Sequence, residues 1–208
     1  MIICIMGESG TGKTTSMRNL DPASTVYIDC DKKGLSWKGW KKQYIKDKNY
    51  YVTDFSSSVK QILDHCEKEE KVKTVIVDTL NGIMVADEMR RRKEKGYDKW
   101  QDLAAAVYEI VDFALTMRDD INVIFVCHTQ TDHDDNGFMF TRIKTSGRKL
   151  DKITLESKFT TVLLSKCIDG EYVFETQSNF STAKSPMGAL EPIVENDITK
   201  VIEALKEY

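Results

Sequence analysis

Short apolar runs alternate with segments of helical periodicity along most of this chain. The candidate strands are runs rich in β-branched or aromatic residues, at Ile2–Met6, Thr25–Asp29, Tyr50–Asp54, Lys73–Asp78 and Asn122–His128. The predicted helices cover Lys13–Leu20, Ser57–Glu69, a long stretch from Ile83 to Arg118 that breaks near Gly96, and Asp197–Glu207. This alternation predicts an α/β fold, in which helices flank a mostly parallel central sheet.

The pattern changes after His128. Residues 131–149 are polar and rich in charge and glycine, which predicts a loop. Two strand-like runs follow, Phe159–Ser165 and Tyr172–Thr176, and the tight-turn pair Asp169-Gly170 between them predicts a C-terminal β-hairpin region. Because no repeat, linker or low-complexity segment interrupts the chain, we expect residues 1–208 to form one domain. Helix caps are expected from Ser56 to Ser58 and from Asn196.

Composition restricts the choice of partners and of compartment. The 208 residues are 41% hydrophobic and 30% charged, with a formal net charge of −3, so any site for a polyanion has to be a local patch. The apolar start is too short for a signal peptide or membrane span. The five cysteines are odd in number and scattered, which predicts buried, reduced thiols in a cytoplasmic protein: Cys4, Cys30, Cys66, Cys127 and Cys167.

The segment from Gly7 to Thr14 reads G-x-x-x-x-G-K-T and lies between a predicted strand and a predicted helix. In such a P-loop, backbone N–H groups converge on the β-phosphate of a nucleotide, Lys13 reaches the β and γ oxygens, and the Thr14 hydroxyl can bind Mg²⁺. The following helix adds its positive N-terminal end. The predicted nucleotide-binding residues are Gly7, Glu8, Ser9, Gly10, Thr11, Gly12, Lys13, Thr14 and Thr15.

Carboxylates at the ends of two other strands complete the predicted chemistry. Asp78 ends an apolar strand, where it can hold the water shell of Mg²⁺. Hydrolysis also needs a group that orients the attacking water, and Asp31 is the preferred candidate for that base. Asp29 and Glu88 remain alternatives to Asp31.

A polar residue also ends the apolar run Val123–His128. His128 is predicted to lie beside the γ-phosphate, to donate a hydrogen bond there, and to report the nucleotide state to the segment that follows. The catalytic candidates from the sequence are therefore Lys13, Asp31 and His128.

These elements, in this order and spacing, resemble the core of RecA-type recombinases. More closely, the chain resembles a family of phage-encoded, RecA-like nucleotide-binding proteins, ATPases implicated in single-strand annealing and recombination, on the stretches Ser181–Pro186 and Glu195–Ile198. The resemblance implies a RecA-like fold, ATP and Mg²⁺ as cofactors, binding of single-stranded DNA and residence in the host cell cytoplasm. RecA-type proteins usually have glutamate where this chain has Asp31, a side chain shorter by one methylene group.

The same resemblance implies that residues 131–149 face DNA. Four cations there could meet phosphates, and Phe138 or Phe140 could stack on bases: Arg142, Lys144, Arg148 and Lys149. The interleaved aromatic and basic residues of Trp37–Tyr44 are a competing stacking platform, although packing of the tryptophans on the core is the preferred interpretation. A single-strand DNA-binding protein is a possible further partner.

Lys184 is predicted to act in an oligomer, reaching the γ-phosphate bound by a neighbouring subunit.

Two other functions use the same P-loop. A small-molecule or nucleoside kinase would bring arginines over the phosphates, and the run Arg90–Arg92 could form such a lid. A nucleotide-gated switch with little turnover is the other alternative. No N-K-x-D string for guanine is present, which favours ATP.

Overall fold

The computed structural model describes residues 1–134, 136–145 and 154–207, and in these residues the strands form one nine-stranded sheet. Its order is β3-β2-β4-β5-β1-β7-β8-β9, with β6 paired to β5 alone. The strands are β1 (Ile2–Gly7), β2 (Thr25–Asp29), β3 (Tyr50–Val52), β4 (Thr74–Asp78), β5 (Asn122–His133), β6 (Met139–Ile143), β7 (Thr161–Ile168), β8 (Glu171–Glu175) and β9 (Ile193–Glu195). Along the sheet, the neighbouring strands in the part β3-β2-β4-β5-β1-β7 are all parallel. Strands β6, β8 and β9 are antiparallel to the strands they pair with.

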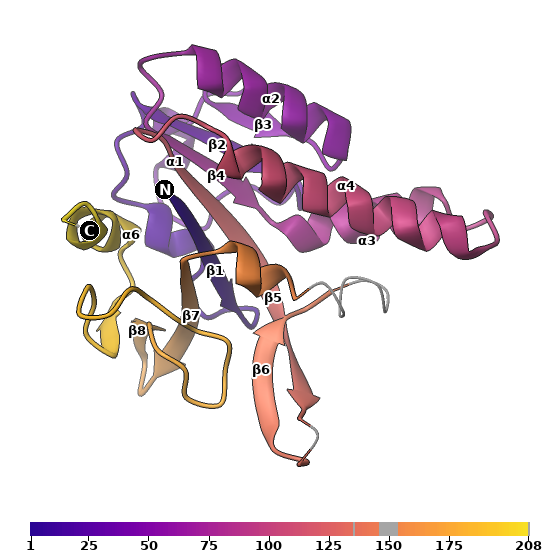
Figure 1. Cartoon of the computed structure of the whole chain (residues 1–208). Helices are drawn as coiled ribbons and strands as arrows, with labels where there is room; N and C mark the ends of the chain where they lie inside the picture. The colour runs from indigo at the N-terminus through magenta and orange to yellow at the C-terminus, as the bar shows by residue number, and fades with distance from the viewer. Residues whose placement is uncertain (135, 146–153, 208) are drawn as a thin grey trace.

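Helices cover both faces of the sheet because its central strands carry apolar side chains on both sides (Figure 1). The core on one face packs against α2 (Ser56–Lys68), α3 (Leu80–Arg90) and α4 (Tyr97–Leu115). The opposite core packs against the 3-10 turn η1 (Thr14–Met17) and α6 (Ile198–Leu205). A short α1 (Trp40–Gln43) and a second 3-10 turn, η2 (Leu155–Lys158), complete the described elements. The predicted α/β class, with its mostly parallel sheet and C-terminal hairpin, is confirmed.

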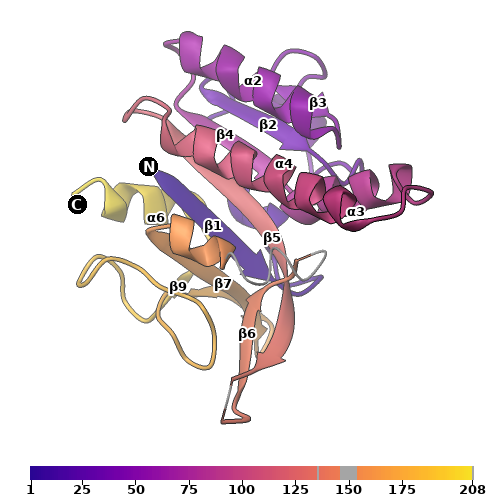
Figure 2. The ribbon, with the colours of Figure 1, turned by 45° about the vertical axis from the view of Figure 1, so that its right-hand side comes forward.

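The strand register brings the sequence-predicted polar residues to one edge of the sheet. Gly7 on β1 pairs with His128 on β5, and Asp29 on β2 pairs with Asp78 on β4. Strand β5 lies between β1 and β4, so the P-loop and Asp78 are two strands apart (Figure 2). Because parallel strands run toward the same edge, the ends of β1, β2 and β4 and the middle of β5 form one site.

Several local predictions are confirmed and others are wrong. The long helical stretch is broken at Gly96 (φ 112°), between α3 and α4, as predicted. The helix predicted at Lys13–Leu20 is only the single 3-10 turn η1. Helix α2 follows Phe55 and has no side-chain cap, and α6 is capped by Asp197, which accepts from the Thr199 N–H, so the expected caps are wrong.

The loop predicted over residues 131–149 is largely a β-hairpin. Strand β5 continues past His128 to His133, and β6 pairs back along it from Met139 to Ile143, so the hairpin projects beyond the sheet (Figure 1). In this part of the chain β5 and β6 pair with each other and most of their residues are not buried, which explains why they lack the apolar alternation of a buried strand. Arg148 and Lys149 lie outside the described residues.

The cysteine prediction is confirmed except at one position. Cys4, Cys30, Cys66 and Cys127 are buried free thiols, whereas Cys167 is exposed near the end of β7. Across the described ranges, none of the helices has the length and apolar character needed to cross a membrane.

Candidate functional site

The P-loop wraps around the amine of its own lysine. Lys13 is buried, and its Nζ donates to the carbonyl oxygens of Gly7 at 2.8 Å and Glu8 at 2.6 Å. Gly10 (φ 84°) and Gly12 (φ 90°) take left-handed conformations that strain other residues, which turns the backbone of the loop around this amine. Burial lowers the pKa of Lys13, and the nearby Lys33 lowers it further, while Asp78 raises it.

The C-terminal strands support the P-loop from behind. The Ser165 hydroxyl donates to the Thr11 carbonyl at 2.6 Å, and the Asn196 amide donates to that hydroxyl at 3.1 Å. A Cβ on Gly12 would lie 2.8 Å from Cδ1 of Tyr172, so this ring packs directly on the loop. The sequence does not predict that Ser165, Tyr172 and Asn196 contact the P-loop, because each lies more than 150 positions from it.

Thr14 and Asp78 form the metal side of the site. The Thr14 hydroxyl donates to Asp78 Oδ2 at 2.8 Å, and the buried Tyr27 hydroxyl donates to the same oxygen. Asp78 Oδ1 is buried and has no hydrogen-bond partner among the described residues. Burial raises the pKa of this carboxyl.

This arrangement fits a hard divalent cation. A buried carboxylate oxygen with an unused lone pair beside a threonine hydroxyl supplies the oxygen ligands and the negative charge that Mg²⁺ prefers. Thr14 and Asp78 are therefore the residues that would hold Mg²⁺, directly or through its water shell.

Asp29 and Asp31 have different environments although they are two residues apart. Asp29 is buried and accepts from the backbone N–H groups of Lys32 and Gly34, each at 2.8 Å. It also accepts from the Tyr50 hydroxyl at 2.6 Å. These three bonds occupy its oxygens, so Asp29 is a structural residue that shapes the loop after β2, and it is a poor alternative base.

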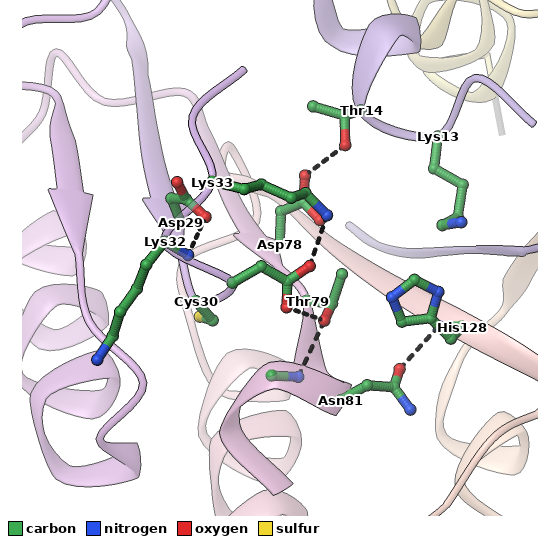
Figure 3. Close-up of polar contacts among 12 residues, drawn as sticks. Lys13, Thr14, Asp29, Cys30, Lys32, Lys33, Asp78, Thr79, Asn81 and His128 are labelled. Atoms are coloured by element: carbon green, nitrogen blue, oxygen red, sulfur yellow. Dashed lines mark hydrogen bonds and ion pairs between the residues drawn. The ribbon is translucent and has the colours of Figure 1, made fainter. Parts of the chain in front are cut away.

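Asp31 faces the site and stays partly accessible, with 18% of its side chain exposed. Its Oδ1 accepts from the Thr79 hydroxyl at 2.9 Å, and its Oδ2 pairs with Lys33 Nζ at 2.6 Å (Figure 3). A Cβ on Gly82 would lie 2.5 Å from Asp31 Oδ1, so glycine at that position leaves room for the carboxylate. The third candidate, Glu88, lies eight residues beyond the first residue of α3, about 12 Å along the helix axis, and is too far from the strand ends.

His128 lies at the P-loop, where it was predicted. Its backbone N–H donates to Oδ1 of Asn81 at 2.7 Å (Figure 3). The amide of Asn81 donates to the Lys144 carbonyl at 2.7 Å. Burial lowers the pKa of His128, and the charge of Lys13 lowers it further. The imidazole is therefore neutral at neutral pH and can donate one ring N–H.

Side-chain hydrogen bonds join β5, near His128, to the P-loop and to α3. The Thr129 hydroxyl donates to the Glu8 carboxylate at 2.7 Å, which joins β5 to the P-loop. Asn81 joins β5 to the start of α3. Asn81 and Thr129 were missed by sequence reasoning, since a single asparagine or threonine gives no signal without the fold.

The predicted DNA-facing residues are only partly placed together. Phe138 and Lys144 are exposed on and beside the hairpin of β5 and β6. Arg142 has only 13% of its side chain exposed and pairs with Asp132 at 3.4 Å and Glu156 at 3.9 Å. Lys184 is half-buried, and its backbone pairs with Val162.

Two sequence alternatives lose support from side-chain contacts. Arg90 pairs with Asp54 and stacks on Phe55, with its guanidinium carbon 3.7 Å from the ring centroid. Arg91 pairs with Glu94 at 2.7 Å and Asp102 at 2.9 Å, so neither arginine is placed as a phosphate lid. In the Trp37–Tyr44 segment, Trp37 and Trp40 pack against the core, as the preferred interpretation predicted.

A family model described as an AAA domain matches residues 1–185. The chain belongs to this AAA domain family. The P-loop, Asp78, Asp31 and His128 all fall within the matched part of the AAA domain. The chain thus has the fold of an AAA-type, P-loop ATPase.

No curated protein matches this AAA domain. Among solved structures, it is similar to a KaiC-like protein from the hyperthermophilic archaeon Pyrococcus horikoshii, with 12% sequence identity and a TM-score of 0.43. The similarity covers 83% of this chain and 76% of the other. At such low values, the function of this AAA domain has to be argued from its own residues.

Proposed function

We propose that this AAA domain binds ATP with Mg²⁺ at its P-loop, hydrolyses it, and couples its nucleotide state to the handling of single-stranded DNA in phage recombination or annealing. One observation carries the proposal. The ends of β1, β2 and β4 and the middle of β5 bring four side chains together: the buried Lys13, Asp78 with its unpartnered buried oxygen, the partly exposed Asp31 and the neutral His128. These are the parts that NTP hydrolysis needs.

In this proposal each residue has a defined task. The P-loop N–H groups and Lys13 bind the phosphates, and Thr14 with Asp78 holds the metal. When bound, Mg²⁺ neutralises charge on the β- and γ-phosphates. Asp31 orients a water toward the γ-phosphorus and accepts its proton, while the bond from that phosphorus to the β–γ bridging oxygen breaks and ADP leaves with the electron pair.

The route to DNA runs along one strand. His128 lies beside Gly7, and β5 continues from it without interruption to His133 at the tip of the hairpin. A hydrogen bond between the imidazole and the γ-phosphate would thus act directly on this strand. The hairpin exposes the aromatic ring of Phe138, and Lys144 lies at its base, so both stacking and phosphate contacts are available there.

Oligomer formation, with Lys184 acting across a subunit boundary, and cooperation with a single-strand DNA-binding protein belong to the same proposal. The support is the resemblance of the C-terminal stretch Ser181–Pro186 to phage recombination ATPases. That resemblance also supports residence in the host cytoplasm.

A nucleotide-gated switch with little turnover is the second candidate, and two contacts of Asp31 favour it. The Asp31 carboxylate is held by Lys33 at 2.6 Å and by Thr79 at 2.9 Å, so it is not free to accept a proton. Tight ATP binding with a rate near zero, both with and without DNA, would select this function over the ATPase.

The test is ATP hydrolysis with and without single-stranded DNA, at low salt where phosphate contacts are strongest. Lys13→Ala is the background control because it removes the phosphate-binding amine. A rate that DNA stimulates and that Lys13→Ala abolishes would support the full proposal. A rate indifferent to DNA, with no ATP-dependent change in DNA binding, would contradict the DNA part and leave an ATPase.

A further inference from the structure

Lys33 is a cation at the site that the P-loop motif does not include. Its Nζ lies 2.6 Å from Asp31 Oδ2, and about half of its side chain is exposed. Figure 3 shows the side chain extending from the loop after β2 toward Asp78, on the side of the site where Thr14 lies. Lys33 is therefore a second lysine beside the carboxylates that flank the predicted position of the terminal phosphate.

The backbone of the loop fixes this direction. Asp29 accepts from the N–H groups of Lys32 and Gly34, and Lys32 takes a left-handed conformation with φ 59°. The neighbouring Lys32 consequently points away from the site (Figure 3). Its amine pairs with Asp54 at 2.7 Å. The side chains of these two adjacent lysines thus point in different directions, and only that of Lys33 faces the P-loop.

The electrostatics agree with the geometry. Burial lowers the pKa of Lys33, but the hydrogen bond from its amine to Asp31 and the charge of Asp78 raise it more, so the pKa is raised and the amine is charged. The charge of Lys33 in turn lowers the pKa of Lys13. The two ammonium groups therefore act on the same small region, together with the carboxylates of Asp31 and Asp78.

We propose that Lys33 is a second phosphate-binding lysine, which exchanges the Asp31 carboxylate for the terminal phosphate of a bound nucleoside triphosphate. This inference rests on the proposed binding of ATP. A terminal phosphate carries more negative charge than one carboxylate, so it competes effectively for the ammonium group. When Lys33 changes partner, one oxygen of Asp31 becomes available to orient water.

The exchange makes Lys33 a sensor for the third phosphate. A diphosphate has no γ-phosphate to draw the amine away, so Lys33 stays on Asp31 and adds nothing to affinity. Lys33 is thus expected to discriminate ATP from ADP, while Lys13, which reaches the β-phosphate as well, contributes to the binding of both nucleotides.

Calorimetric titration of ATP and ADP, each with Mg²⁺, tests this in Lys33→Met, which keeps the aliphatic stem and removes the charge. ATP affinity should fall roughly tenfold, whereas ADP affinity should change less than about twofold. Lys32→Met is the matched control and should leave both affinities unchanged. Lys33→Arg, which retains the cation, should restore most of the preference for ATP.

Equal losses for ATP and ADP in Lys33→Met, or no loss for either, would overturn the inference. The wild type separates this failure from that of the proposed function. If the wild type binds ATP and Lys13→Ala abolishes that binding, unchanged affinities in Lys33→Met refute the role of Lys33 alone. If the wild type binds neither nucleotide, the proposed function fails, and the role of Lys33 fails with it.

Discussion

The Thr14 hydroxyl donates a 2.8 Å hydrogen bond to Oδ2 of Asp78, which joins the end of the P-loop to the end of β4 across 64 positions of sequence. The second oxygen of Asp78 is buried without a partner among the described residues. An ionised carboxylate in this position costs stability, and a divalent cation would offset that cost. Without metal, the buried charge of Asp78 therefore lowers the stability of the fold at the position where we expect the cation to bind.

Asp78→Asn should therefore separate stability from metal binding. The amide keeps one oxygen to accept from Thr14 and Tyr27 and removes the buried charge, so the free energy of unfolding should stay equal or rise by about 1–2 kcal/mol. The dependence of ATP affinity on Mg²⁺ should disappear. Denaturant unfolding and nucleotide titration with and without Mg²⁺ measure the two effects.

Thr14→Ser is the control for Asp78→Asn, because it keeps the hydroxyl that donates to Asp78. It should retain both stability and the Mg²⁺ dependence. Retained Mg²⁺ dependence in Asp78→Asn would show that Asp78 does not hold the metal.

The sequence predicted those parts of the site that are encoded by contiguous residues. The P-loop and the strand ends at Asp78 and His128 each follow an apolar run, so their positions could be predicted from a few neighbouring residues. The parallel order of the strands then brings them together.

Other parts depend on contacts that no local pattern encodes. Tyr172 reaches Gly12 only because β8 pairs with β7 beside the P-loop strand. Lys32 and Lys33 look equivalent in sequence, and only the turn around Asp29 directs one of them to the site. The hairpin at 131–143 was predicted as loop because nearly all of its residues lie outside the core, with Ile143 as the exception.

Gly12→Ala should damage the P-loop more than Gly10→Ala. Both positions have left-handed φ angles, which cost an alanine about 1–2 kcal/mol. A Cβ at Gly10 would meet nothing within 4 Å, whereas at Gly12 it would lie 2.8 Å from the Tyr172 ring. The extra loss for Gly12→Ala should appear in both the free energy of unfolding and ATP affinity.

The double variant Gly12→Ala with Tyr172→Ala tests the cause. Measured against Tyr172→Ala, the loss caused by Gly12→Ala should shrink toward that of Gly10→Ala, since removing the ring relieves the shortest contact and leaves only that with Asn196 Oδ1 at 3.2 Å. If the losses of the two single variants simply add, Tyr172 does not limit the space at Gly12.

Asp29 and Asp31 should respond differently to the same change. Asp29→Ala leaves two N–H groups and the Tyr50 hydroxyl without their acceptor, so it should cost about 2–4 kcal/mol of stability. Asp31→Ala should change stability by less than about 1 kcal/mol, because its ion pair with Lys33 is partly exposed. Its hydrolysis rate should fall by roughly 10²-fold or more.

Thermal unfolding and a steady-state ATPase assay measure these two effects side by side. A stable Asp29→Ala, or an Asp31→Ala variant that hydrolyses ATP at the wild-type rate, would reverse the roles assigned to the two acids.

His128 should make the stability of the protein depend on pH. In the folded protein the pKa of His128 lies below the ordinary 6.5, and burial of the ring is the largest cause. The positive charges of Lys13, Lys33 and Lys144 lower this pKa further, whereas the negative charge of Asp31 raises it. The unfolded chain therefore binds a proton more readily than the folded one. The stabilising contribution is present above about pH 6.5 and is lost as pH falls through the folded pKa.

His128→Gln cannot take up this proton but keeps a side chain of similar size and a donor. Relative to that variant, the melting temperature of the wild type should fall by about 1–3 °C as pH decreases from about 8 to about 5. Parallel melting curves across this range measure the difference. A constant difference between the two proteins would mean that His128 titrates in the folded protein as it does in the unfolded chain, which contradicts a buried, neutral imidazole at the P-loop.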